Sequence, residues 1–455
     1  MGMRLSSAAI VRHALLMLMD NSAAWAFTIC RRLANLGMLA TIVDNSACAG
    51  GLRFATIFPI SSSYLTGLAG LAGLAAPVLA DEGEGEKWVF SGDARLRYEN
   101  VDQDGFADEA QALTLRVRAG VTTPTWHGFQ LLVEGEAIAA LSTEYNSTAN
   151  GKVWLPIVAD GETIELNRAQ ITYKGIEGTT LTLGRQRITL GNQRFIGNVG
   201  WRQNEQTFDA FRVDTKFTGV TLTYAYIDTV QRVFGNESPN GEFESDSHLV
   251  YADIAAGDFG NITPYLYALD LEEAPTQSTL TFGARWSGSW GLDDETKLTL
   301  AADLARQSDY GANPFSVDLG YGAFDAEIKN GPYAFFAGVE WLDGNGVLGF
   351  STPLATLFKF NGWADAFLNT PTIGLTDFYA GATANFADIG EGLDLSLTLK
   401  IHDFSDADRD ISFGSEVDLL AALKWDCGMA LEARYASYDR DDAGPASRDK
   451  VWLSL

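Results

Sequence analysis

The feature that most limits how this chain can fold is an alternation of apolar and polar residues along most of its length. In residues 113–122 leucine and valine alternate with threonine and arginine, and in residues 393–402 leucine alternates with polar side chains. A period of two predicts β-strands rather than helices. Most of the segments run ten to thirteen residues, whereas strands of soluble sandwiches usually have about five or six. Crossing a bilayer with tilt needs this length, so we favour a membrane sheet over a soluble sandwich.

We count eighteen such segments, an even number. They lie at 88–100, 111–123, 128–140, 165–175, 178–187, 206–217, 219–231, 246–256, 261–270, 277–288, 295–307, 319–328, 332–343, 373–386, 392–404, 413–426, 428–440 and 447–455. The sequence therefore predicts an all-β fold, a transmembrane antiparallel β-barrel of about 18 strands. Closure removes the sheet edges that lipid would not tolerate.

The connections between the segments alternate in length. The even-numbered ones are short, and several odd-numbered ones are long, notably 141–164, 188–205, 232–245 and 344–372. Bacterial outer-membrane barrels combine short periplasmic turns with longer external loops. The short, even-numbered connections are therefore predicted to be periplasmic. Because the number of strands is even, both termini are then predicted to be periplasmic as well.

The first eighty residues precede the barrel pattern. Residues 52–80 are largely apolar and end in Val78-Leu79-Ala80, which fits a signal peptide cleaved between Ala80 and Asp81. Residues 1–51 form a long N-terminal extension, and we interpret them as the result of a start codon assigned too early. Residues 81–455 are the predicted barrel domain.

The net charge of −27 makes nucleic acid an unsuitable partner. Many acidic residues fall in predicted external loops, such as DQDG at 102–105 and DADRD at 406–410. We expect outer-membrane lipid and lipopolysaccharide around such loops. We expect no cofactor; Ca²⁺ at these acidic loops is the weaker alternative, because their spacing is too loose for an EF-hand loop.

Basic residues of the strands are expected to face the lumen, because a cation facing lipid costs about 2–4 kcal/mol near the midplane. These residues are Arg95, Arg97, Arg116, Arg118, Arg168, Lys174, Arg212 and Arg434. Eighteen strands leave a water-filled channel rather than a packed interior. Alternatively, each arginine pairs with a carboxylate such as Glu134 or Glu136 and stiffens the wall. The sequence leaves both interpretations open.

Two of the long loops carry candidate pore residues. Loop 188–205 contains Arg194, Trp201 and Arg202; it either folds inward and narrows the pore or stays an ordinary external loop. Folded inward, Trp201 would stack on a sugar face. Loop 344–372 contains FKFNGWADAFL and is apolar enough to tuck into the barrel mouth as a lid.

Two blocks resemble the alginate export family of outer-membrane porins. The longer is GRQRITLGNQRFIGNVGWRQNEQTFDAFRV from Gly184, the shorter FKFNGWADAFLNTP at 358–371, and the resemblance covers about residues 90–455. It implies an eighteen-stranded barrel, an arginine-rich constriction selective for polyuronate, a gating loop, and periplasmic export proteins as partners. Within the first block it adds Arg185 and Arg187 to Arg194, Arg202 and Arg212 as pore residues.

We therefore predict an integral outer-membrane channel that passes an anionic, alginate-like polysaccharide. The alternative is an uptake porin for small anionic or sugar-like solutes. An enzyme is not expected, since no GxSxG motif accompanies the few histidines. A purely structural barrel or adhesin is the remaining alternative.

The proposed start codon gives a direct prediction. Mass spectrometry of the precursor is expected to find no peptide from residues 8–31, and the mature chain is expected to begin at Asp81. Detection of a peptide covering Ala8–Arg31 in cells would show that the extension is translated.

Overall fold

The structure, a computed structural model, describes residues 87–390, 392–441 and 443–455. The extension 1–51, the signal peptide 52–80 and the cleavage site at Ala80 and Asp81 all lie outside the described residues, so they remain predictions. Within these residues, no helix has the length and apolar character that a membrane-spanning helix requires.

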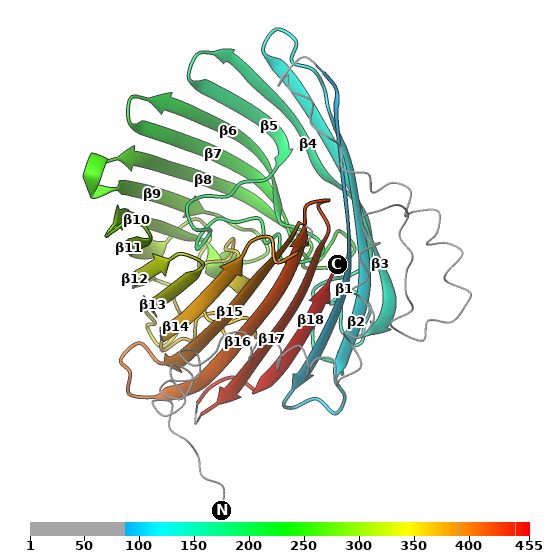
Figure 1. Cartoon of the computed structure of the whole chain (residues 1–455), viewed down its shortest axis with the longest axis vertical. Coiled ribbons are helices and arrows are strands. Elements are labelled where there is room, and N and C mark those ends of the chain that lie inside the picture. Colours follow the sequence, from blue (N-terminus) through cyan, green and yellow to red (C-terminus); the bar gives the residue numbers. More distant parts are fainter. Residues whose placement is uncertain (1–86, 391, 442) are drawn as a thin grey trace, which may run out of the picture. The chain divides into compact units, whose positions relative to one another are not determined.

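Eighteen antiparallel strands form a single closed sheet, as the sequence predicted. Each strand pairs with the next, and β1 pairs with β18 to close the ring (Figure 1). The strands are β1 Val89–Gln103, β2 Ala110–Thr122, β3 Phe129–Glu144, β4 Thr163–Ile176, β5 Thr179–Gln186, β6 Thr207–Phe217, β7 Val220–Gln231, β8 Glu242–Ala255, β9 Asn261–Leu269, β10 Thr279–Gly291, β11 Thr296–Asp309, β12 Asp318–Asn330, β13 Tyr333–Leu342, β14 Leu375–Phe386, β15 Leu393–Ser405, β16 Ser412–Trp425, β17 Ala430–Arg440 and β18 Arg448–Ser454. The short 3₁₀ helices η1 Gly257–Phe259, η2 Pro275–Gln277 and η3 Leu357–Lys359 lie in connections.

The strand register separates an apolar outer face from a polar inner face. Across β1 and β2, Leu96 pairs with Leu115 on the outer face, and Asp93 pairs with Arg118 on the inner face. Outward side chains are exposed in the isolated chain, for example Leu304 at 71% and Leu183 at 60%. An apolar band of this kind suits contact with hydrocarbon, so the predicted sidedness is confirmed.

The long connections all lie at one end of the barrel, because they follow odd-numbered strands. They are 145–162, 187–206, 232–241 and 343–374. We call 187–206 loop A and 343–374 loop B. In Figure 1 green and yellow coils, the colours of these two loops, lie inside the ring of strands. Which end faces the cell exterior remains a prediction from loop length.

Loops A and B give the barrel an apolar core, which the sequence analysis did not expect. One buried cluster joins Ile188 and Ile196 of loop A, Leu354 and Phe367 of loop B, and wall residues such as Phe208. The expectation of a wholly water-filled lumen is therefore wrong for this part of the barrel. The physical reason is that both loops carry large apolar side chains and fold inward, so they fill the space that the strands enclose.

The sidedness can be tested at neighbouring positions of β15. Leu399 faces outward opposite Leu419, and Thr398 lines the lumen. We expect Leu399→Arg to lower the unfolding free energy in lipid vesicles by about 2–4 kcal/mol. Thr398→Arg, the matched control, is expected to lower it much less, because its guanidinium stays in water. If urea titrations showed an equal loss of unfolding free energy for both variants, the assignment of the two faces would be contradicted.

Candidate functional site

Loops A and B are joined to each other inside the barrel. The Gly197 N–H donates to the Leu354 carbonyl at 2.8 Å, and the Thr356 N–H donates to the Gln193 carbonyl at 3.0 Å. The Gln206 amide donates to the carbonyls of both Gly197 and Leu354, at 2.9 and 3.1 Å. Gly197 has no side chain, and a Cβ there would collide with Thr356. The inward fold of loop A, one of the two sequence interpretations, is therefore the one observed, and loop B tucks in as predicted.

Gln203 fixes loop A to the wall formed by β1 and β2. Its backbone N–H donates to an Asp160 carboxylate oxygen at 2.9 Å, and its side-chain amide donates to the Thr114 hydroxyl at 2.9 Å. The Arg95 guanidinium donates to the Gln203 side-chain carbonyl at 2.9 Å. Gln203 is completely buried, so loop A lies directly on the strands that carry the predicted pore arginines.

Loop A covers these arginines, and carboxylates neutralise all but Arg95, which donates to Gln203 and to backbone carbonyls of loop A instead. Arg97 lies 3.3 Å from Glu99 and 3.7 Å from Asp160, and all three side chains are buried. Arg202 pairs with Glu99 at 3.0 Å and with Asp365 of loop B at 3.1 Å. One set of buried ion pairs therefore ties β1, loop A and loop B together.

The same arrangement continues around β2, β3 and β4. The pairs are Arg116 with Asp93 at 2.6 Å, Arg118 with Glu136, Arg118 with Glu205 at 3.6 Å, Arg168 with Glu134 at 2.7 Å, and Arg187 with Glu205 at 2.5 Å. Asn167 also donates to Glu134 and Glu205, at 2.8 and 2.7 Å. The structure thus brings most predicted arginines together, but as the wall-stiffening ion pairs that the sequence offered as an alternative.

The acidic partners supplied by the loops stay charged. Burial pushes the pKa of Glu205 upward, but hydrogen bonding and charge from Arg187 and Arg118 outweigh it and leave the pKa below its ordinary value. Burial acts in the same way on Asp365, and the charges of Lys450 and Arg202 again bring its pKa below the ordinary range. Both carboxylates are therefore ionised at neutral pH and balance the arginines.

Arg194 is a structural anchor rather than a pore residue. It is fully buried, pairs with Glu340 of β13 at 2.6 Å, and donates to the Asn361 side chain of loop B at 3.1 Å. Its guanidinium also lies 4.9 Å from the centre of the Phe360 ring. With no surface left for a solute, Arg194 holds loop A against β13 and loop B.

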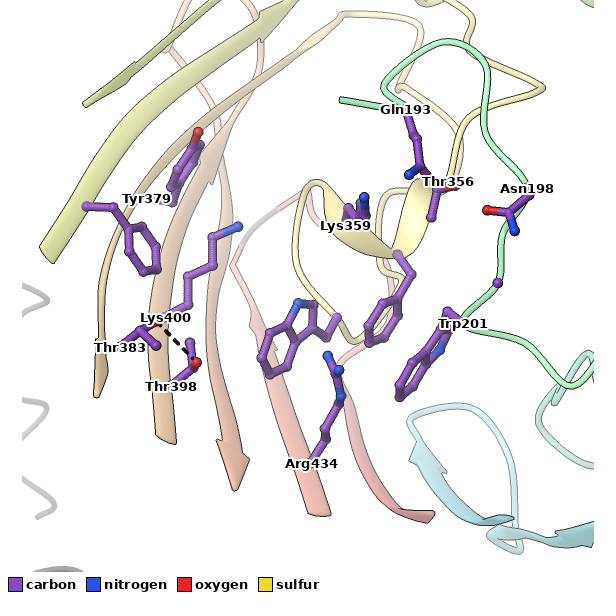
Figure 2. A pocket seen from close by; sticks show the side chains of 14 residues that line it. Gln193, Asn198, Trp201, Thr356, Lys359, Tyr379, Thr383, Thr398, Lys400 and Arg434 are labelled. Atoms are coloured by element: carbon purple, nitrogen blue, oxygen red, sulfur yellow. Dashed lines mark hydrogen bonds between the residues drawn. The ribbon is translucent and has the colours of Figure 1, made fainter. Parts of the chain in front are cut away.

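An aromatic and cationic surface remains open to the lumen. Trp201 of loop A stacks on Phe358 of loop B, with ring centres 3.9 Å apart, and Phe358 stacks in turn beside Trp363 at 5.9 Å. Arg434 rises from β17 among these rings, 4.4 Å from the centre of Trp201 and 4.8 Å from that of Trp363 (Figure 2). Trp452 of β18 completes the cluster, with its ring centre 5.6 Å from that of Trp201. Trp201 and Arg434 are thus the predicted residues that reach the open surface.

Two adjoining cavities extend from this surface. The first, of about 560 Å³, is lined by Trp201, Phe358, Trp363 and Arg434 together with Lys359, Tyr379, Thr398 and Lys400. The second, of about 450 Å³, shares Lys359, Tyr379 and Lys400 with the first. Lys400 of β15 points toward the cavity in Figure 2, across from helix η3, which carries Lys359. The shared residues place both lysines where the two cavities meet.

Lys359 and Lys400 were missed as candidate site residues, although the sequence contained part of the signal. Lys400 is a polar position of an alternating strand, so its inward direction was predictable. Lys359 lies in the FKFNGWADAFL segment that was expected to enter the barrel mouth. The sequence could not show that the arginines would be buried and that these lysines would stay open.

Three other predicted residues lie apart from the cavities. Arg185 is a correction: it shares the outer face with Leu183 and pairs with Asp209 at 2.7 Å. The physical reason is the period of two, which puts Thr182 and Gln186 inside and Arg185 outside. Arg212 faces the lumen and is paired with Asp214 at 2.8 Å. Lys174 lies near the end of β4, beside the short turn.

In the part of the chain that the structure describes, no group of three or more His, Cys, Asp or Glu side chains is arranged to hold a metal ion.

The sequence matches a family model described as alginate export over residues 87–322. The chain belongs to the alginate export family. The match includes the block from Gly184 to Val213 and ends before the second block at 358–371, so it is shorter than the resemblance suggested. No curated protein matches the chain in sequence.

Solved structures show the same fold at low sequence identity. OccAB4 of Acinetobacter baumannii is 13% identical with a TM-score of 0.65, and the similarity covers 82% of this chain and 99% of that one. OccAB2 of Acinetobacter baumannii is 16% identical with a TM-score of 0.63, covering 82% and 99%. OpdL of Pseudomonas aeruginosa is 17% identical with a TM-score of 0.60, covering 81% and 98%. Family and fold together identify this member of the alginate export family as an integral outer-membrane protein.

Removal of the Arg202 charge tests whether ion pairs hold the loops. Arg202→Gln removes one of the two cations that pair with each of the buried carboxylates Glu99 and Asp365, which keep Arg97 and Lys450. Breaking a buried ion pair costs up to about 3–5 kcal/mol. We therefore expect the loops to detach and single-channel conductance in a planar bilayer to rise. Arg185→Gln, on the outer face, is the control and is expected to conduct like wild type. An unchanged conductance for Arg202→Gln would mean that this ion pair does not hold the loops in place.

Proposed function

We propose that the protein is a passive outer-membrane channel for carboxylated sugars, and that its cargo is an alginate-like polyuronate. The observation that carries this proposal is the open cavity in which Trp201, Phe358 and Trp363 lie beside Lys359, Lys400 and Arg434. Aromatic faces suit the C–H face of a sugar ring, and cations suit its carboxylate. Family membership supports the same class of solute.

The contacts that the first cavity can make with a solute suit passage better than tight binding. The first cavity is lined by Thr383 and Thr398, whose hydroxyl groups bond to each other at 3.2 Å and offer a passing solute neutral hydrogen-bonding partners. A charge-assisted contact is worth about 1.5–3 kcal/mol. Several such contacts in series allow a solute to enter and still leave, which conduction requires.

A second candidate function is the uptake of small anionic or sugar-like solutes. It is favoured by the packed core of loops A and B, because their apolar cluster narrows the lumen. A small solute could pass beside the docked loops, whereas a polymer needs a continuous opening. The two functions therefore differ in whether the loops must move during transport.

Planar-bilayer recordings test the proposal. We expect anion-selective currents under a KCl gradient and concentration-dependent block by oligouronates, with little block by neutral oligosaccharides of equal length. Rapid liposome swelling with small sugars, without oligouronate block, would favour the second function. Cation selectivity with no block would contradict both.

A further inference from the structure

The arginines predicted for the pore are, for the most part, poorly placed to attract a solute. Arg97 and Arg118 of the wall and Arg202 of loop A are all buried. Their partners, including Glu99, Glu136 and Glu205, are buried with them. A cation whose charge is balanced by a carboxylate at contact distance presents little net field to the lumen. Anion attraction must therefore come from cations that lack such a partner.

The cations that line the two cavities differ from one another in whether they have a carboxylate partner. Arg434 pairs with Glu432 at 2.6 Å, and Arg285 pairs with Asp325 at 3.3 Å. Within the described ranges, neither Lys359 nor Lys400 lies within 4.0 Å of a carboxylate oxygen. Lys400 instead lies 4.4 Å from the centre of the Tyr379 ring. These two lysines therefore keep their full charge toward the lumen.

The acids that line the second cavity are already occupied by other donors. Glu340 pairs with Arg194 at 2.6 Å and accepts from the Tyr321 hydroxyl at 2.8 Å. Asp377 contacts His402 at 2.8 Å and accepts from the Asn361 amide at 3.3 Å. Asp325 accepts from the Tyr379 hydroxyl as well as from Arg285. None of these carboxylates is directed at the two lysines.

We infer that Lys359 and Lys400, rather than the arginine cluster, set the anion selectivity of the channel and bind the carboxylate of a passing uronate. The inference rests on the proposed function. Lys359 comes from loop B and Lys400 from the wall, so a carboxylate at the junction of the two cavities contacts both sides of the passage. Phe358 is buried and stacks with Trp201 and Trp363, so the sugar ring lies against the rim of this aromatic cluster, which lines the same cavity.

The experiment compares full-length mature channels in planar bilayers under a KCl gradient, with a trimeric oligouronate as blocker. The variants are Lys359→Gln, Lys400→Gln, the double variant and the conservative Lys400→Arg. Lys152→Gln is the control for loss of one charge, because Lys152 lies in the loop 145–162 and pairs with Glu144 at 3.1 Å. Arg116→Gln tests the competing explanation.

We expect the half-blocking concentration of the oligouronate to rise about tenfold for each lysine removed, as for the loss of a charge-assisted contact. The reversal potential of the double variant is expected to move toward that of an unselective pore. Lys400→Arg retains selectivity, and the wild-type preference weakens as salt is raised, because exposed charges are screened.

Two outcomes would overturn the inference. In the first, the wild-type channel is anion selective and is blocked by the oligouronate, the double lysine variant behaves in the same way, and Arg116→Gln loses its selectivity. The arginine cluster then sets the anion preference, and the proposed function stands. If wild type shows neither anion preference nor block, the proposed function fails, and the role of the lysines fails with it.

Discussion

The need to pair every backbone N–H and C=O at membrane depth governs the whole structure. Lipid offers no hydrogen-bond partners, so a sheet that spans it must close on itself. Here closure is made by seven register pairs between β1 and β18, from Arg97 with Ser454 to Gln103 with Arg448. Once the ring is closed, the period of two sends one set of side chains to lipid and the other to the lumen. The loops and ion pairs of the interior all depend on that division.

Charge balance is the second constraint, and it explains why the interior is filled. Loop A lies on a wall rich in arginine because acids of the wall such as Glu136 balance part of the charge, while Glu205 of loop A and Asp160 and Asp365 of neighbouring loops balance the rest. Burying one member of such a pair alone would cost several kcal/mol. The acidic and basic residues of this region therefore stabilise one another as a single network of ion pairs. The open cavity lies beside this network.

The strands and their faces were largely predictable from the sequence, because alternation is a local property. Each of the eighteen predicted segments overlaps an observed strand, and most boundaries differ by no more than three residues. Arg185 was placed wrongly although its strand contained the answer: Leu181 and Leu183 already marked its face as the outer one.

The partners of the arginines could not be predicted in the same way. Gln203 meets Thr114 across 89 positions of sequence, and Arg194 meets Glu340 across 146. A register shift between Glu134 and Gly135 also lets Asn167 and Arg168 both reach Glu134, which strict alternation forbids. Which cations stay unpaired depends on these contacts between distant residues. Local pattern therefore identified the lumen but not the two lysines that remain open within it.

The position of Trp452 links the solute path to the closure of the barrel. This tryptophan belongs to β18, the final strand of the chain, yet its ring packs against Trp201 and Phe358 of the two inward loops. The strand that closes the barrel against β1 therefore also supplies one wall of the aromatic cluster beside the cavity.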